Sequence, residues 1–409
     1  VVSVADLRPP DGAKVHVQGR ISGPLHETLG VLYDSASGKL AEYLPRGLRA
    51  TGDGVLALYI QVPVRQRRAT HWTGLYRFNQ NGLLLPYKDI HVSAIQGEMA
   101  INEHGVQSGN VGARMLDEAL LVDISPLSDG AGPTPEVLLN VRSKLGRSGL
   151  QHLLGSGLAG YFQGEAPWVF SLRFAGPAAH LALNVDMQGM GTSLPPPLDK
   201  VVGAPLSLSL ESVAADLGPA QHGVDVRLGD RAGGRLLFQH RATGGWSFLR
   251  GRMDVGGAPL SAPDGTGLHL GVRVPVLDAD RWRPVLRAAA HQGGTGAPDF
   301  LTRFSGEVND LVMFGRHFGQ FNLDMVKSPQ GWVSPLRGAT VRGNLLLTTP
   351  ADCAGAGCAS APGRLHNTLV LTLDQLVIPA PAATGVATKE AAFDPASLPE
   401  VHIKSKSLT

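Results

Sequence analysis

The chain has 409 residues, including 52 glycines and 29 prolines; 43% of its residues are hydrophobic and only 17% are charged. Disorder requires low hydrophobicity and high net charge, so this composition indicates a folded protein. The net charge of +2 disfavours a nucleic-acid-binding protein that works by neutralising phosphates, so no nucleic-acid partner is expected. No apolar stretch approaches the roughly 18 residues of a membrane-spanning helix. The chain begins at Val1 without Met and ends at Thr409, so we expect an internal fragment.

Alternation of apolar and polar residues is the dominant pattern along the chain. It recurs over residues 56–62, 181–187, 206–210, 224–228, 268–276, 321–325 and 369–373. A period of two places successive side chains on opposite faces of a strand. Turn signals such as Asn81-Gly82 and Gly244-Gly245 separate the runs. The pattern predicts a mainly β protein built from antiparallel hairpins and meanders.

Helical patterns are confined to short segments. Residues 134–146 carry Val137, Leu138, Val141 and Leu145 at helical spacing. Residues 280–290 begin with a potential capping aspartate and continue with one apolar stripe. A third short helix is expected within residues 25–32. Because none is long enough to form a layer, we expect these helices at the edges or ends of the sheet.

No group of residues predicts catalysis. Residues 155–160 match G-x-G-x-x-G, but a helix tail precedes them and no good helix start follows. A flexible linker is therefore favoured over a dinucleotide site. The 14 histidines form no metal-binding pair, and the carboxylates lack the spacing of an acid–base pair. We expect neither an enzyme nor a cofactor.

The two cysteines, Cys353 and Cys358, lie in one Gly/Ala-rich loop. A metal site needs further ligands, and the nearest downstream histidine is His366, which stands alone. A short-loop disulfide in an oxidising compartment is favoured, with a metal site as the alternative.

The apolar face of a long sheet must be covered by curling, by a second sheet or by a lipid-like ligand. Glycines in or beside the strand runs, such as Gly74, Gly251, Gly271 and Gly343, favour a sheet bent along a crease. We predict a long antiparallel sheet curled into an elongated apolar groove, with a few short helices at its edges or ends. A β-sandwich with a dry core is the alternative.

Several ordered motifs resemble the AsmA-like family of Gram-negative envelope proteins. The most specific is LNVDMQGMGTSLPPPLDK at residues 183–200, a strand followed by Asp-x-x-Gly and Leu-Pro-x-Pro-Leu-x-Lys. Residues 166–174 resemble the family's Pro-Trp strand entry, and residues 277–286 its Leu-Asp-x-Asp-x-Trp helix start. Residues 314–345 resemble its closing strands. The resemblance covers residues 160–350, and the cysteine-containing insertion at 351–363 departs from it.

With this resemblance, the chain divides into four predicted segments. They are a groove segment at residues 1–130, a helical insertion and Gly-rich linker at 131–162, a second groove segment at 163–350, and a Cys-containing loop with final strands at 351–409.

The resemblance implies a function in lipid transport. Members of the family are anchored in the inner membrane, extend across the periplasm and are implicated in moving phospholipid toward the outer membrane. It therefore implies a periplasmic location, an anchor outside this fragment, phospholipid acyl chains as ligand, and envelope proteins as possible partners. The alternative is a non-enzymatic envelope scaffold or assembly module with a dry, sandwich-like core. The predicted groove lining consists of Leu56, Leu58, Ile60, Val62, Leu181, Leu183, Val185, Leu206, Leu208, Leu210, Val224, Val226, Leu268, Leu270, Val272, Val274, Leu323, Met325, Leu369 and Leu371.

Overall fold

A computed structural model describes most of the chain. It describes residues 2–5, 14–27, 49–63, 70–85, 90–102, 105–127, 137–175, 178–213, 221–240, 246–256, 265–290, 300–348, 368–379 and 400–405. Among these residues no helix has the length and hydrophobicity needed to cross a membrane. Cys353 and Cys358, with the predicted disulfide, lie outside the described residues.

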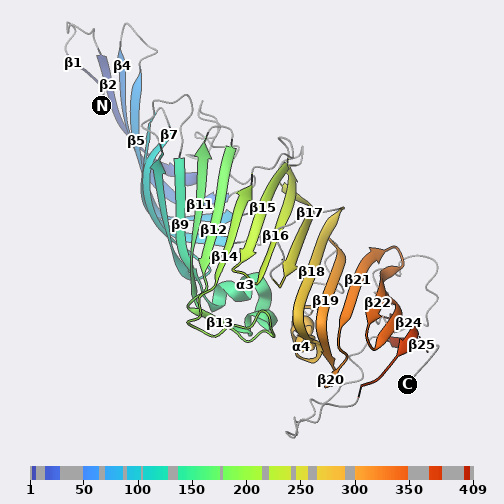
Figure 1. The fold of residues 1–409 in the computed structure, drawn as a ribbon. Coiled ribbons are helices and arrows are strands. Elements are labelled where there is room, and N and C mark those ends of the chain that lie inside the picture. Colours follow the sequence, from blue (N-terminus) through green and yellow to red (C-terminus); the bar gives the residue numbers. More distant parts are fainter. Residues whose placement is uncertain are drawn as a thin grey trace, which may run out of the picture.

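One sheet of 23 strands makes up almost the whole described molecule (Figure 1). In order of pairing, its first strands are β1 (Val2–Ala5), β2 (Lys14–Pro24), β4 (Asp53–Pro63), β5 (His71–Leu85), β6 (Ile90–Asn102), β7 (Gly105–Met115), β8 (Glu118–Pro126), β9 (Val137–Leu145), β11 (Ala166–Ala175) and β12 (Ala178–Asp186). The order continues through β14 (Ser207–Val213), β15 (Gln221–Leu228), β16 (Ala232–His240), β17 (Trp246–Val255), β18 (Gly267–Asp278), β19 (Leu301–Met313), β21 (Phe321–Ser328), β22 (Gly331–Gly338), β23 (Val341–Thr348), β24 (Thr368–Leu376) and β25 (Glu400–Ser405).

Short strands and two helices complete the described elements. β3 (Arg49–Thr51) pairs with β5, and β20 (Arg316–His317) pairs with β19. β10 (Phe162–Gly164) and β13 (Met190–Thr192) form a separate two-stranded sheet. The helices α3 (Arg147–Ala159) and α4 (Ala279–Ala290) lie at one end of the central strands of the long sheet (Figure 1). The first and last strands, β1 and β25, lie at opposite ends of the molecule (Figure 1).

The sheet is mixed, whereas the sequence predicted an antiparallel one. Most neighbouring strands are antiparallel, but β17 pairs with β18, β18 with β19, and β24 with β25 in parallel. Parallel neighbours require a crossover connection. The helix α4 belongs to the crossover between β18 and β19, so this short helix accompanies a parallel pairing that alternation alone does not encode.

The hydrogen-bond register gathers the alternating apolar residues on one side of the sheet, because paired residues point to the same face. One row of successive partners is Leu56, Tyr76, Met99, Gly109, Ile124, Leu139, Leu172 and Leu181. A second row is Val122, Val141, Phe170, Leu183, Leu210, Val226, Gly234, Met253, Leu270, Phe304 and Met325. We call this side the apolar face and the other side the polar face.

The structure differs from two predictions: the helix at residues 134–146 and the flexible linker at residues 155–160. Residues 137–145 form strand β9, not a helix, and β9 pairs with β8 and β11 over its length. The run VLLNVRSKL fits the helical period and the strand period alike. Pairing with the two neighbouring strands stabilises it as a strand. The Gly-rich residues 155–159 belong to α3, which is interrupted at Gly155 (φ 75°). The helix predicted at 280–290 is confirmed as α4; of residues 25–32, the described 25–27 are helical.

Candidate functional site

The apolar face is partly accessible along its middle. Of the twenty predicted lining residues, Val185 and Val274 are buried, with 6% and 4% exposure, whereas the other eighteen are only partly buried. All lie in strands on the apolar face except Leu206, which directly precedes β14. From β12 to β17 the large aliphatic side chains of this face, apart from Val185, are all partly buried. The structure therefore presents a continuous hydrocarbon surface here that is neither a closed core nor fully exposed.

Toward the N-terminus the same face is more deeply buried. Val92, Ile95, Val111 and Leu120 form a buried cluster, and Tyr76 is only 1% exposed. The sequence analysis missed this part of the face. Bulges in β6 interrupt the strict alternation on which that analysis relied.

The helix α3 covers the apolar face at one end of the central strands. Leu150 of α3 is 4% exposed and joins a buried cluster with Ala166, Val185 and Met190. Leu183, Leu208 and Trp168 of the apolar face pack against this cluster. At this end, the central strands meet α3, α4 and residues 187–206. We call this end of the apolar face the helix edge.

Residues 187–206 include most of the family motif at residues 183–200. Hydrogen bonds from Lys200, Arg231 and Trp282 hold this segment at the helix edge. Lys200 is 5% exposed, and its ammonium group donates to the carbonyls of Met190 (2.6 Å) and Val201 (3.2 Å). Burial, reinforced by the nearby Arg231, lowers the pKa of Lys200.

Two further residues donate to the carbonyls of the proline run. The Arg231 guanidinium donates to Pro197 and Asp199, and Trp282 of α4 donates to Pro196 (3.1 Å). The motif segment thus covers the strand ends at the helix edge. The Lys200 and Arg231 cations are hydrogen-bonded to its backbone carbonyl groups.

Aromatic rings gather at the opposite ends of the central strands. His222 and Trp246 stack with ring centroids 4.5 Å apart, and Trp246 is 48% exposed. Phe248 makes edge contacts with Phe238 (5.9 Å) and Phe300 (5.7 Å). We call these five residues the aromatic rim. The sequence analysis did not single them out, because they lie near the ends of different strands and come together only through pairing.

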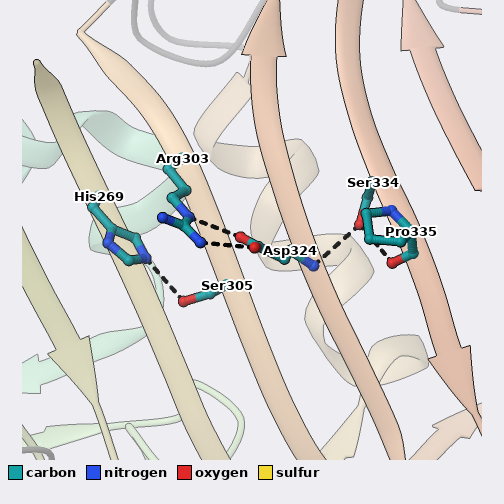
Figure 2. A network of polar contacts seen from close by, with 6 residues as sticks. All are labelled: His269, Arg303, Ser305, Asp324, Ser334 and Pro335. Atoms are coloured by element: carbon teal, nitrogen blue, oxygen red, sulfur yellow. Dashed lines mark hydrogen bonds and ion pairs between the residues drawn. The ribbon is translucent and has the colours of Figure 1, made fainter. Parts of the chain in front are cut away.

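The polar face carries cross-strand ion pairs. Arg235 binds both carboxylate oxygens of Asp225 (2.6 and 2.9 Å), and Arg303 binds both of Asp324 (2.8 and 2.7 Å). Figure 2 shows the second pair, with the Asp324 amide donating to Ser334 (3.1 Å). The hydrogen bond from Arg303 lowers the pKa of Asp324. Charge on one face and hydrocarbon on the other make the sheet amphipathic.

His269 lies within this polar network. It pairs across the sheet with Arg252 on one side and Arg303 on the other, is 9% exposed, and bonds through Nε2 to the Ser305 hydroxyl (2.9 Å; Figure 2). Burial, followed by the two arginines, lowers its pKa, against the smaller opposing effect of Asp254 and Asp324.

The site is thus a surface suited to binding an elongated apolar molecule. Within the described part of the chain, no cluster of three or more His, Cys, Asp or Glu residues could hold a metal ion. The Lys200 and Arg231 cations at the helix edge are hydrogen-bonded to carbonyls, and the polar face is stabilised by its own ion pairs.

Comparisons with known proteins agree with this arrangement. The YhdP protein family model matches residues 1–408. The intermembrane phospholipid transporter YhdP of Escherichia coli strain K12 is 23% identical over 356 residues, which cover 85% of this chain. The match spans 26% of that transporter's length, about a quarter. No solved structure gives a significant match.

Proposed function

The chain belongs to the YhdP family, and on that basis we propose that it carries phospholipid along its apolar face between the two membranes of the Gram-negative envelope. The observation that carries the proposal is the unbroken apolar face with partly accessible aliphatic side chains from β12 to β17. In this proposal the apolar face of the sheet serves as a groove for acyl chains.

The energetics of acyl chains fit such a surface. Each CH₂ group transferred from water to hydrocarbon contributes about 0.8 kcal/mol, so a chain lying on the face binds without specific polar contacts. Movement along the face requires similar affinity at successive positions. Aliphatic residues repeated across neighbouring strands, as in the row from Leu183 through Leu210 to Val226, supply that similarity.

The location follows from the same proposal. The described chain would lie in the periplasm as part of a longer protein anchored in the inner membrane, with envelope proteins as partners at either end. The E. coli relative, described as an intermembrane phospholipid transporter, supports this placement. Any energy input for directional transport would come from those partners.

Two neighbouring substitutions in β14 test the proposal. Leu210→Asp places a charge on the apolar face, between Leu183 and Val226, whereas Ser209→Asp places the same charge on the polar face, opposite Arg227. Native mass spectrometry of protein purified from a Gram-negative host should show co-purified phospholipid with the unaltered chain and Ser209→Asp. We expect Leu210→Asp to lose the lipid while its circular dichroism keeps the β signal.

A lipid-free unaltered chain with a stable fold would contradict the proposal and favour a scaffold with a dry core. Loss of lipid in both variants would show that the effect is not specific to the apolar face. Unfolding of Leu210→Asp alone would place Leu210 in an ordinary core; the smaller change Leu210→Ser then repeats the test.

A further inference from the structure

From the two unlike edges of the apolar face, we infer that phospholipid lies along the central strands with its headgroup at the aromatic rim and its acyl chains directed toward α3. This inference rests on the proposed function and adds an orientation and a headgroup site to it. The rim residues belong to or directly adjoin β15, β16, β17 and β19, next to the accessible part of the face.

The helix edge is already filled by the protein's own side chains. Met190 is 1% exposed and Ala166 is fully buried, and both pack with Leu150 of α3. The Lys200 and Arg231 cations point at backbone carbonyls. A hydrated, charged headgroup placed there would have to displace buried hydrocarbon, so this edge suits the terminal methyl groups of the acyl chains.

The aromatic rim has the opposite character. Trp246 and the exposed His222 form a stacked pair that combines apolar rings with polar nitrogens. Trp is enriched where hydrocarbon meets water, because its ring is apolar and its N–H needs a polar partner. Phe238 and Phe248 continue the ring surface from this pair onto the apolar face.

The length of the strands agrees with this orientation. β16 runs from Ala232, beside the turn that holds Arg231, to His240, the partner of Trp246. Eight residue steps of about 3.3 Å span roughly 26 Å. One leaflet of a bilayer has about 15 Å of hydrocarbon. An acyl chain that starts below the rim therefore fits between the rim and α3.

Depth-dependent fluorescence quenching tests the orientation in the full chain. Phosphatidylcholine brominated near the carbonyl group and phosphatidylcholine brominated near the terminal methyl group are each loaded from vesicles. Trp246→Phe should remove most of the quenching by the first lipid, and Trp168→Phe, at the helix edge, most of the quenching by the second. The two variants are compared with the same two lipids and share the three other tryptophans of the chain.

Three other outcomes are informative. The reverse assignment, or equal loss in both variants, overturns the orientation while leaving phospholipid binding intact. An absence of quenching by either lipid in the unaltered chain overturns the proposed function and this inference with it. If a variant fails to fold, benzoylphenylalanine in place of Trp246 gives the same information: crosslinks near the headgroup support the orientation, and crosslinks near the chain terminus refute it.

Discussion

His269 illustrates how a single residue on the polar face couples stability to pH. Its imidazole lies between Arg252 and Arg303, and burial next to two cations favours the neutral ring. The pKa of His269 is therefore lowered from 6.5 in the folded chain. As the pH falls below 6.5, the unfolded chain binds a proton that the folded chain does not, so acid destabilises the fold.

Replacing His269 should remove this sensitivity. The unaltered chain is expected to lose up to about 1.4 kcal/mol of unfolding free energy per pH unit below 6.5, until the lowered pKa is reached. His269→Asn should flatten that slope. Urea unfolding at a series of pH values, compared between the two proteins, measures the difference. Equal acid-induced losses in both would show that other groups are responsible.

Lys200 is a second example at the scale of single residues, because its buried ammonium group is hydrogen-bonded to carbonyl groups. Lys200→Met should remove the ammonium donor from the carbonyl of Met190, at a cost of about 1–3 kcal/mol, whereas the Val201 carbonyl still accepts from the amide of Ala204. Lys144→Met is the control, since the Lys144–Glu165 ion pair is half exposed and solvent-exposed ion pairs add little to stability. Urea unfolding at neutral pH compares them, and equal losses would contradict the structural role of Lys200.

At the scale of elements, α3 covers the apolar face at one end of the central strands and so limits the accessible area there. It has no side-chain cap at its N-terminus and is interrupted at Gly155, so its own helical stability is low. Packing of Leu150 and Ala159 against the apolar face compensates. The sheet thus stabilises the helix, and the helix shields the apolar side chains at the helix edge from water.

Leu150→Ala measures this mutual dependence. Leu150 is 4% exposed within the cluster, so its truncation should cost about 2–4 kcal/mol of unfolding free energy. Gln151→Ala, one residue away and exposed, should change it by less than about 0.5 kcal/mol. Chemical denaturation gives both values. A cost for Leu150→Ala as small as that of the control would show that α3 is not held by this contact.

At the scale of the whole molecule, the central strands of the sheet are amphipathic. The ion pairs of one face and the aliphatic rows of the other belong to the same strands: Arg235 and Leu236 are neighbours in β16, and Arg303 and Phe304 are neighbours in β19. A large accessible apolar surface on a folded protein usually marks a binding site. This asymmetry supports the proposal that one side of the sheet holds a hydrocarbon ligand.

This architecture predicts dye binding by the folded state. The delipidated chain should bind 8-anilinonaphthalene-1-sulfonate while retaining native β circular dichroism and cooperative unfolding, and phospholipid vesicles should displace the dye. A dry scaffold would bind little dye until it unfolds. Dye binding that persists unchanged after lipid addition would contradict a shared surface.

The sequence by itself determined the class of fold and the composition of the apolar face. Alternation at positions such as Leu181, Leu183 and Val185 requires only a strand with two unlike faces, and this information is local. The same reasoning failed at residues 137–145, where the run fits helical and strand periods alike and pairing with β8 and β11 settles the outcome.

Only the tertiary structure decided which residues meet. The parallel strands around β18, the packing of α3 on the apolar face and the aromatic rim all depend on contacts between segments far apart in the chain. His222 and Trp246 carry no shared local signal, yet the pairing of β15, β16 and β17 brings their rings together. Periodicity specifies which way a side chain points, whereas strand order and register specify its neighbours.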